Sequence, residues 1–503
     1  MIYIFKRNLF LIIFISIQIL LNLSCKTTLK NANMDSEFKK NDHFYFEPNS
    51  WEKMCIKDKI EVGCWLTGSF DHVAVESKRI PILRGPSSTT ETQFVITVSK
   101  NDDPLVYRIF DRKARSILVP YKVSEAQRDF SGFKNIHLLF NNLKPETEYE
   151  FLVASDSGAV VDERKFKTWP KKMKSVDFAV ASCMDDFYLK QGGEQIWNEM
   201  LDWQPQALLL IGDNVYATKR DGKPIIPMSL KDLWGRYVDG RLSMPLFKRY
   251  ILVPTYAVWD DHDYGAKDGD RDFELKDQSL KIFRDFYSHE PLLNTYENGP
   301  GAGSVFTIAN QRFILADDRF FRTADARVKP GEDPQSVNSE QTHFGEQGEN
   351  WIFKNLNASV KPTWLISGDQ FFGAYHEFDS YEGVHPKSFV RFLALLRHVK
   401  SKVIFISGDR HLSEFMKIEK EILGYPTYEI TSSGLHAKTY PGAWDKTKNP
   451  RFFRGESGVF NYTMIRSEIV GGKSLNMQVS SYKLNKELIY KELVNIPMFN
   501  SKK

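Results

Sequence analysis

The sequence VIFISGDRH at residues 403–411 joins a short apolar run to Gly408-Asp409 and His411. A run of this length, rich in Val, Ile and Phe, predicts a strand buried on both faces of a sheet. In open α/β sheets ligands bind outside the carboxyl ends of the strands, so polar residues at such ends meet in space. Four further apolar runs end in a thiol, a carboxylate or a histidine: FAVASC at 178–183, ALLLIGDNVY at 207–216, TYAVWDDHDYG at 255–265 and TWLISGDQ at 363–370.

The dipeptide Gly-Asp closes three of these runs, at Asp213, Asp369 and Asp409. A single Gly-Asp after a strand is most often a turn, in which Gly supplies an unusual φ and Asp bonds the local backbone. Three such pairs, together with Asp-Asp-His-Asp at the end of a fourth run, favour a shared site over independent turns. The sequence therefore predicts one cluster of acidic side chains.

The residue types in this cluster indicate metal binding. Carboxylates that are crowded in a half-buried cleft raise one another's pKa, and a bound cation reverses that effect. Oxygen ligands suit Ca²⁺, Mg²⁺, Mn²⁺ or Fe³⁺, and a thiolate with a phenolate beside them suits a redox-capable iron. The pattern predicts a mixed centre of at least two ions.

At these residues the chain resembles a known family. GDNVY at 212–216, WDDHDYG at 259–265 and SGDRH at 407–411, with ASC at 181–183, resemble the motifs of PhoD-like alkaline phosphatases. That family belongs to the calcineurin-like metallophosphoesterases and is similar to the purple acid phosphatases. Supporting matches are ADDRFFR at 316–322, GEQGENW at 345–351 and TSSGL at 431–435, so the resemblance spans roughly residues 174–440.

The resemblance implies the ions and their ligands. It implies Fe³⁺ and Ca²⁺, with Mg²⁺, Mn²⁺ or Zn²⁺ as alternatives, and it implies that Asp213 bridges the metals. Tyr216 and Cys183 would bind the ferric ion, and Asp261 would hold the second metal. The full implied ligand set is Cys183, Asp213, Tyr216, Asp261, Asp369, Asp409 and His411.

The resemblance also implies a reaction, the hydrolysis of phosphoric esters by in-line attack of a metal-bridging hydroxide. Asp213 would then take part in catalysis by bridging the two metals. His262 is the predicted acid for the leaving group or a ligand of a phosphate oxygen, and Asp263 is predicted to orient it. Arg319, Arg322 and Arg410 are candidates to bind the phosphoryl oxygens through two guanidinium N–H groups, and Arg319 is preferred, although arginines commonly form ion pairs instead. His262 as a buried structural histidine and Tyr216 as a packing aromatic are the alternatives.

The predicted fold class is α/β, with two domains. The resemblance implies a metallophosphoesterase four-layer sandwich, two mixed β-sheets flanked by helices, over residues 174–497. Short alternating strands and turns between about 62 and 168 indicate a smaller β-sandwich, assigned to 56–169. The segment from Leu143 to Phe151 resembles the fibronectin type III signature in which a tyrosine, here Tyr149, ties down a corner.

The N-terminus is predicted to be a targeting segment. Lys6-Arg7 precedes an apolar stretch that ends near Ser24-Cys25, which is typical of a signal peptide over residues 1–25. Cys25 resembles the lipidated cysteine of a bacterial lipobox, and simple secretion is the alternative. Residues 26–55 would be a tether. Cys55 and Cys64 could form a disulfide in an exported protein or remain free and buried.

Composition sets the remaining expectations. The 503 residues are 42% hydrophobic and 26% charged, which is typical of a soluble globular chain. The net charge is +4, and the sequence contains no basic stripe of the kind that binds nucleic acid. We expect a monomeric, exported protein of the bacterial cell envelope, lipid-anchored through Cys25, periplasmic or at the cell surface. Its partners would be phosphoester small molecules or diesters. The alternatives are a phosphodiesterase or phospholipase D-like enzyme acting on lipid or nucleotide diesters, and a non-catalytic surface lipoprotein.

Overall fold

The computed structural model describes residues 44–47, 71–74, 79–155, 160–293, 295–326, 341–376, 379–443 and 448–498. These residues belong to one compact unit that begins at Phe44. The predicted signal segment with Cys25, most of the tether, and both Cys55 and Cys64 lie outside the described residues. No described helix is both long and apolar enough to cross a membrane.

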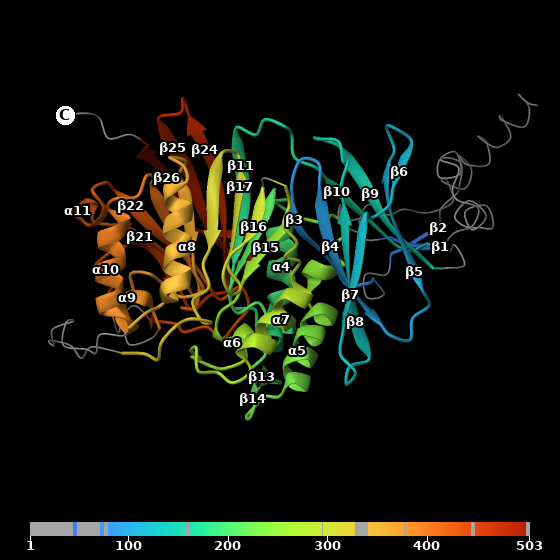
Figure 1. Cartoon of the computed structure of the whole chain (residues 1–503), viewed down its shortest axis with the longest axis horizontal. Coiled ribbons are helices and arrows are strands. Elements are labelled where there is room, and N and C mark those ends of the chain that lie inside the picture. The colour runs from blue at the N-terminus through green and yellow to red at the C-terminus, as the bar shows by residue number, and fades with distance from the viewer. Residues whose placement is uncertain are drawn as a thin grey trace, which may run out of the picture. The chain divides into compact units, whose positions relative to one another are not determined.

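Two four-stranded antiparallel sheets precede the motif-bearing part of the chain (Figure 1). Alternate residues of their strands point to a shared core in which Phe94 stacks on Phe151 at a centroid distance of 4.4 Å. The Lys144 N–H donates to the Tyr149 hydroxyl at 2.7 Å, which is the corner contact that the sequence predicts. One sheet has the order β3 (Ile82–Ser87), β4 (Thr92–Ser99), β8 (Phe133–Phe140), β7 (Lys122–Gln127), and the other β10 (Val160–Lys167), β9 (Glu148–Ser155), β5 (Leu105–Asp111), β6 (Ser116–Leu118).

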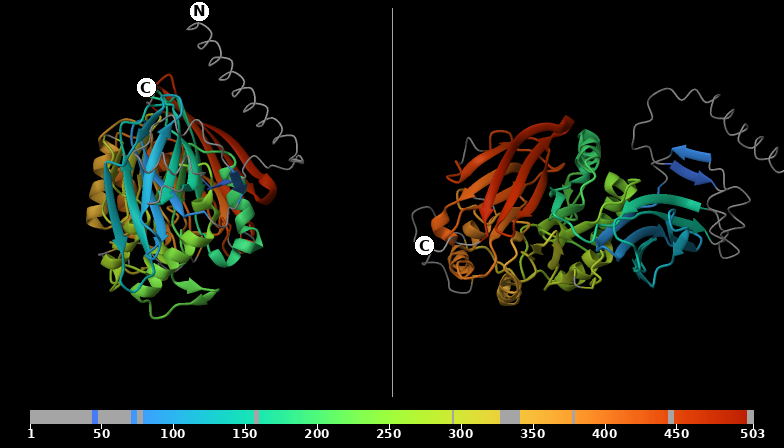
Figure 2. Two further views of the ribbon diagram at one scale, coloured as in Figure 1. Left: turned by 90° about the vertical axis from the view of Figure 1, so that its right-hand side faces the viewer. Right: turned by 90° about the horizontal axis from the view of Figure 1, so that it is seen from above.

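A six-stranded mixed sheet carries the first three motif strands. Residues 168–174 lead from β10 into it, and the predicted domain boundaries, 56–169 and 174–497, stay a prediction. Strands β11, β12 and β15 are parallel, and the C-terminal strands, red in Figure 2, continue the sheet in antiparallel fashion. The order is β15 (Thr255–Val258), β12 (Ala207–Ile211), β11 (Ser175–Ala181), β24 (Asn461–Val470), β25 (Ser474–Lys483), β26 (Glu487–Pro497).

An eight-stranded mixed sheet carries the other two motif strands. Its central strands β18, β19, β20 and β22 are parallel, so their carboxyl ends share one edge. Phe178 of the six-stranded sheet packs edge-on against Phe313 and Trp364 of this one. The order is β16 (Tyr296–Asn298), β17 (Ser304–Ile308), β18 (Gln311–Leu315), β19 (Thr363–Ile366), β20 (Val403–Ser407), β22 (Thr427–Ser432), β21 (Leu412–Ile418), β23 (Phe452–Ser457).

Helices cover both sheets, and the fold is α/β. Apolar residues of α8 and α10 share a buried cluster with the eight-stranded sheet, and those of α4, α5 and α7 belong to the cluster around the six-stranded sheet. Figure 1 shows α8, α9 and α10 together at one end. The helices are α4 (Gly193–Leu201), α5 (Leu230–Ser243), α6 (Asp261–Tyr264), α7 (Lys276–Phe286), α8 (Gly345–Asn357), α9 (Tyr381–Val384), α10 (Pro386–Leu396) and α11 (Lys420–Leu423), with 3₁₀ turns η2 (Asp186–Gln191), η3 (Pro245–Lys248) and η5 (Leu484–Lys486).

Two short strand pairs complete the described secondary structure. Strands β1 (Phe44–Glu47) and β2 (Asp71–Ala74) pair in antiparallel fashion. Strands β13 (Lys219–Arg220) and β14 (Lys223–Pro224) form a small hairpin soon after the GDNVY motif. This hairpin matters below because it places Lys219 close to the predicted metal cluster.

Candidate metal centre

The predicted strand ends converge. Each of the five apolar runs forms a strand, and the polar residues follow directly at the carboxyl end. The residues that arrive there are Cys183 after β11, Asp213 and Tyr216 after β12, Asp261, His262 and Asp263 in α6 after β15, Asp369 after β19, and Asp409 and His411 after β20.

Three glycines let these strand ends approach closely. Gly212, Gly368 and Gly408 are the glycines of the three Gly-Asp pairs, and the Gly408 N–H donates to the Gly368 carbonyl at 2.8 Å. A Cβ on Gly408 would lie 2.9 Å from that carbonyl and 3.0 Å from the carbonyl of Ile211. A Cβ on Gly212 would lie 2.7 Å from the Cβ of Asp260. Because these glycines have no side chain, the backbones of the two sheets can approach closely. Their role is therefore not limited to turn geometry.

Four predicted ligands have unusual backbone conformations. Cys183, Asp213, Asp409 and His411 have φ values of 58°, 53°, 59° and 49°. Residues other than glycine rarely adopt positive φ, and such conformations persist only where the surrounding structure enforces them. Their concentration at the strand ends marks the same cluster that the sequence predicts.

The first ligand group contains Cys183, Asp213 and His411. One donor atom from each lies within 4.8 Å of the donor atoms of the other two. The Tyr216 hydroxyl joins them, since it lies 2.9 Å from His411 Nε2. Thiol, carboxylate, imidazole and phenol donors in one place suit a transition metal. These are the residues that the resemblance assigns to the ferric site, with His411 added.

The second group contains Asp213, Asp261 and His262, again with donor atoms within 4.8 Å. Asp213 belongs to both groups, which is the position that a bridging carboxylate requires. The Asp213 side chain also accepts the His262 backbone N–H at 3.1 Å, so α6 is held against the β12 end. Oxygen donors dominate this group and suit a harder ion than the first group does.

Asp409 lies in a third group with Asp260 and Asp369. Both oxygens of Asp369 already accept hydrogen bonds, from Arg319 Nη2 at 2.9 Å and from Arg322 Nη1 at 2.6 Å. The predicted ligand role of Asp369 therefore competes with an ion-pair network and stays a prediction.

Arg319 forms ion pairs within the protein. Its guanidinium is 1% exposed and donates to three carboxylates, those of Asp260 through Nε at 2.6 Å, Asp369, and Asp379 through Nη1 at 3.3 Å. The sequence predicts a fork donor to substrate oxygens. The structure shows these nitrogens bound to protein carboxylates in an enclosed ion-pair network, and a contact with substrate oxygens stays a prediction.

Asp263 also has partners within the protein. It accepts the backbone N–H groups of Asn214, Val215 and Asp260 at 3.0, 2.9 and 3.2 Å. These bonds fix the loop that carries Asp213 and the start of α6. The hydroxyl of Thr218 contacts His262 Nδ1 instead. The structure places Thr218 against the imidazole, and the orienting role of Asp263 stays a prediction.

The electrostatics of the cluster favour a cation. Burial raises the pKa of Asp213 well above its usual range, and the charges of Asp261, Asp263 and Asp409 add to this shift. Burial likewise raises the pKa of the Cys183 thiol and of the Tyr216 phenol, and it raises the pKa of Asp409 to about 7. Without a cation the groups resist ionisation together, whereas a bound metal would stabilise the ionised forms. The donor set therefore fits the implied metals.

Sequence reasoning missed several residues that support the cluster. Ser433 Oγ lies 3.2 Å from Cys183 Sγ and accepts the His411 N–H at 2.8 Å, and it belongs to the TSSGL match. Asp260 is the second residue of the WDDHDYG motif, but its partner Arg319 is 59 residues away in sequence and only the fold brings them together. Thr218 follows the GDNVY motif by two residues, and no local pattern links it to His262.

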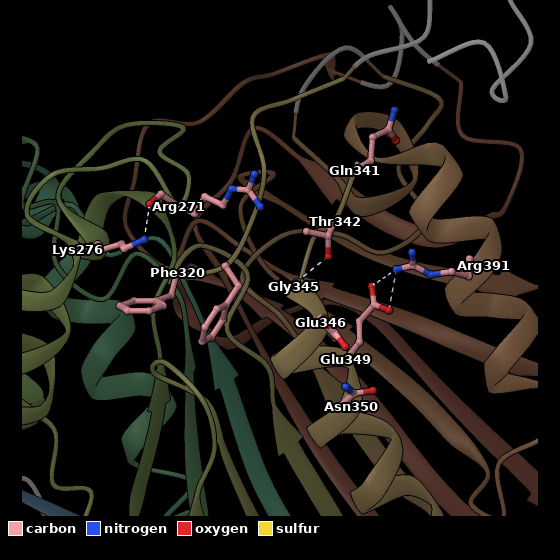
Figure 3. Close-up of a pocket in the computed structure, with 11 residues that line it drawn as sticks. Arg271, Lys276, Phe320, Gln341, Thr342, Gly345, Glu346, Glu349, Asn350 and Arg391 are labelled. Atoms are coloured by element: carbon pink, nitrogen blue, oxygen red, sulfur yellow. Dashed lines mark hydrogen bonds and ion pairs between the residues drawn. The ribbon is translucent and has the colours of Figure 1, made fainter. Parts of the chain in front are cut away.

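A separate cavity of 580 Å³ lies on the other side of the ADDRFFR loop (Figure 3). Phe320 and Phe321 line it, whereas Arg319 and Arg322 of the same loop bind Asp369. In Figure 3 the Glu349–Arg391 ion pair closes one wall of the cavity. None of the residues in the described metal-ligand groups lines it, so this cavity is distinct from the candidate metal centre.

Comparisons with known proteins agree with this site. The sequence model of the PhoD-like phosphatases matches residues 178–457. Alkaline phosphatase D of Bacillus subtilis (strain 168) is 25% identical in an alignment of 350 residues that covers 60% of this chain and 58% of the relative, so less than two thirds of that protein is matched. A solved structure of PhoD is similar with a TM-score of 0.63 at 16% identity, covering 82% of this chain and 91% of that one, which supports the fold. Because the family match spans more than half of the chain and contains all five apolar runs with their polar ends, the chain belongs to the PhoD-like phosphatase family.

Proposed function

We propose that this protein is a metal-dependent phosphoric ester hydrolase that acts on phosphomonoesters, phosphodiesters or both. The observation that carries the proposal is that Asp213 belongs to two adjoining ligand groups of different donor character. Such a pair of sites can hold two cations against one phosphoryl group. Membership of a phosphatase family supports the same reaction class.

Cys183, Asp213, Tyr216 and His411 would hold Fe³⁺, and Asp213 with Asp261 would hold Ca²⁺. Mg²⁺, Mn²⁺ and Zn²⁺ are the alternatives. When bound, the metals would supply charge neutralisation at the phosphoryl group and a nucleophile at neutral pH. The ion assigned to each group of residues follows from the donor atoms of that group. Thiolate and phenolate donors suit iron, and oxygen donors suit calcium.

His262 would assist departure of the leaving group. Its ring stacks on the Tyr216 ring with a centroid distance of 4.0 Å, and Thr218 Oγ1 contacts Nδ1. If the Thr218 hydroxyl donates to Nδ1, the proton of the neutral imidazole sits on Nε2. Burial lowers the pKa of His262 to about 4, so the ring is neutral near pH 7 in the metal-free protein. Thr218 would thereby set the tautomer that offers an N–H to the leaving-group oxygen.

Chelation tests the proposed function directly. We expect the purified protein to hydrolyse 4-nitrophenyl phosphate or bis(4-nitrophenyl) phosphate, and exhaustive treatment with a strong chelator to abolish the activity. The reason is that the crowded carboxylates require cations to ionise together. Elemental analysis before and after chelation identifies the ions. Full activity in metal-free protein, or hydrolysis of neither ester by the metal-loaded protein, would contradict the proposal.

Replacing His262 by alanine should lower kcat by about 10²-fold, the usual contribution of a general acid. The loss should be greatest for alkyl phosphates, whose alkoxide leaving groups are strongly basic, and smallest for 4-nitrophenyl esters. Steady-state kinetics over a leaving-group series measures this dependence. An equal loss across the series would assign His262 to phosphate binding or to structure.

The finer features belong to the same proposal. We propose that the two sheets and their helices form the four-layer metallophosphoesterase sandwich and that the preceding strands form a fibronectin III-like domain. We further propose a monomer exported to the bacterial cell envelope and lipid-anchored through Cys25. A phosphodiesterase or phospholipase D-like preference for lipid or nucleotide diesters is the alternative activity, and the substrate panel distinguishes it. A non-catalytic surface lipoprotein would hydrolyse none of these esters.

A further inference from the structure

The enclosure of Arg319 leaves open which cation binds the substrate phosphoryl group. Arg322 is also buried, and its Nη1 and Nη2 donate to Asp369 and to Asp325 and Asp379. Lys267, farther along the chain after α6, forms an ion pair with Asp268 at 3.2 Å. Beyond the metals, a positive charge that meets the substrate would come from another side chain near the two ligand groups, where Arg410 stands between Asp409 and His411 and Lys219 follows Tyr216.

Lys219 has the required position. It lies three residues after Tyr216, and its backbone N–H donates to the Tyr216 carbonyl at 3.2 Å. Its ammonium lies 4.8 Å from the centroid of the Tyr216 ring. The β13–β14 hairpin fixes the backbone at Lys219 through its pairing with Pro224. Lys219 is half-buried, and no carboxylate among the described residues forms an ion pair with it, whereas its neighbour Arg220 pairs with Asp239.

The Tyr216 ring connects this ammonium to both ligand groups. The tyrosine hydroxyl contacts His411 of the first group, and the ring stacks on His262 of the second. Burial lowers the pKa of His262 and of His411 to about 4 each, and the nearby charge of Lys219 contributes in the same direction at both. Lys219 is therefore electrostatically close to both histidines.

We propose that the Lys219 ammonium binds a non-bridging phosphoryl oxygen of the substrate and selects phosphomonoester dianions over singly charged phosphodiesters. This inference rests on the proposed function. A monoester at alkaline pH carries a second negative charge on its phosphoryl oxygens, and a diester carries one charge and a second ester group in its place. An ammonium that has no carboxylate partner among the described residues therefore stabilises the monoester more strongly.

The experiment compares the full-length, metal-loaded protein with Lys219→Met, Lys219→Arg and Lys223→Met. Lys223 is exposed on the same hairpin, so its replacement removes the same charge without removing the contact with Tyr216. The substrates are 4-nitrophenyl phosphate and bis(4-nitrophenyl) phosphate, which share a leaving group and differ in charge. Inorganic phosphate serves as a competitive inhibitor, and elemental analysis records the metal content of each variant.

For Lys219→Met we expect kcat/KM to fall by roughly 10- to 100-fold for the monoester, the usual effect of one charged hydrogen bond. The diester should lose far less, and inhibition by inorganic phosphate should weaken in parallel with the monoester. Lys219→Arg should retain most of the selectivity, because the charge remains. Lys223→Met should behave as wild type, and the metal content should not change.

Three results would overturn the inference while leaving the proposed function intact. These are equal losses for both esters, unchanged kinetics in Lys219→Met, and a fall in metal content that explains the lost activity. A wild-type protein that hydrolyses the diester alone would overturn it as well. A wild-type protein that hydrolyses neither ester would reject the proposed function and this inference together.

Discussion

Replacing Asp213 by asparagine is expected to abolish metal binding and to lower kcat by roughly 10³-fold or more. Bound metals contribute several kcal/mol of transition-state stabilisation, and each 1.36 kcal/mol is about tenfold in rate. Asp213 is the residue common to both ligand groups, so its loss removes the charge that both ions would share. Elemental analysis and steady-state kinetics measure the two effects separately.

The same substitution should leave the metal-free fold intact. Burial and neighbouring carboxylates raise the pKa of Asp213 in the folded state, so its ionised form costs stability at pH values above the unfolded pKa, and the full cost applies above the folded pKa. A neutral asparagine avoids that cost and keeps an oxygen for the His262 N–H. The urea midpoint of the metal-free variant should therefore equal or exceed that of the metal-free wild type.

Asp221→Asn is a matched control for this experiment. Asp221 is exposed and has a φ of 51°, close to the 53° of Asp213. Both positions therefore require the residue to adopt a similar positive φ. Asp221→Asn should retain metal and activity. An Asp213→Asn protein with stoichiometric metal and wild-type kcat would show that Asp213 does not bridge the ions.

The sequence predicts the cluster well because its signals are local. An apolar run that ends in Gly-Asp identifies both a buried strand and the residue at its carboxyl end, and parallel strands bring those ends to one edge. This rule alone, with no other information about tertiary structure, predicts that four residues lie together. They are Cys183, Asp213, Asp409 and His411. The Tyr149 corner contact was predictable for the same reason, since Tyr149 and Lys144 are five residues apart.

The partners of the polar side chains were not predictable in this way. Arg319 binds Asp260 and Asp369, which are 59 and 50 residues away in the sequence. Only the approach of the two sheets brings these partners together. The same holds for His262, where Asp263 is adjacent in sequence but accepts backbone N–H groups 48 and 49 residues away. Sequence adjacency suggested an orienting carboxylate, whereas one helical turn points neighbouring side chains in different directions.

Replacing Arg319 by methionine is expected to lower the free energy of unfolding by about 3–5 kcal/mol, the usual cost of removing one partner of a buried ion pair. Asp260 and Asp369 are each at most 1% exposed, so their charges would remain buried without this guanidinium. Chemical denaturation of the metal-free protein measures the loss. Arg319→Lys should give an intermediate loss, because a single ammonium cannot reach three carboxylates as a planar fork does.

Arg220→Met is the control for the stability measurement. Arg220 pairs with Asp239 at 3.2 Å with both side chains more than 40% exposed, and such pairs contribute about 0–1 kcal/mol. The two arginines therefore separate a buried ion-pair network from a solvated one in the same protein. If Arg319→Met unfolded at the wild-type denaturant concentration and showed only a raised KM, Arg319 would bind substrate as the sequence predicts. A large loss of stability would instead show that this arginine holds Asp260 and Asp369 together in the folded protein.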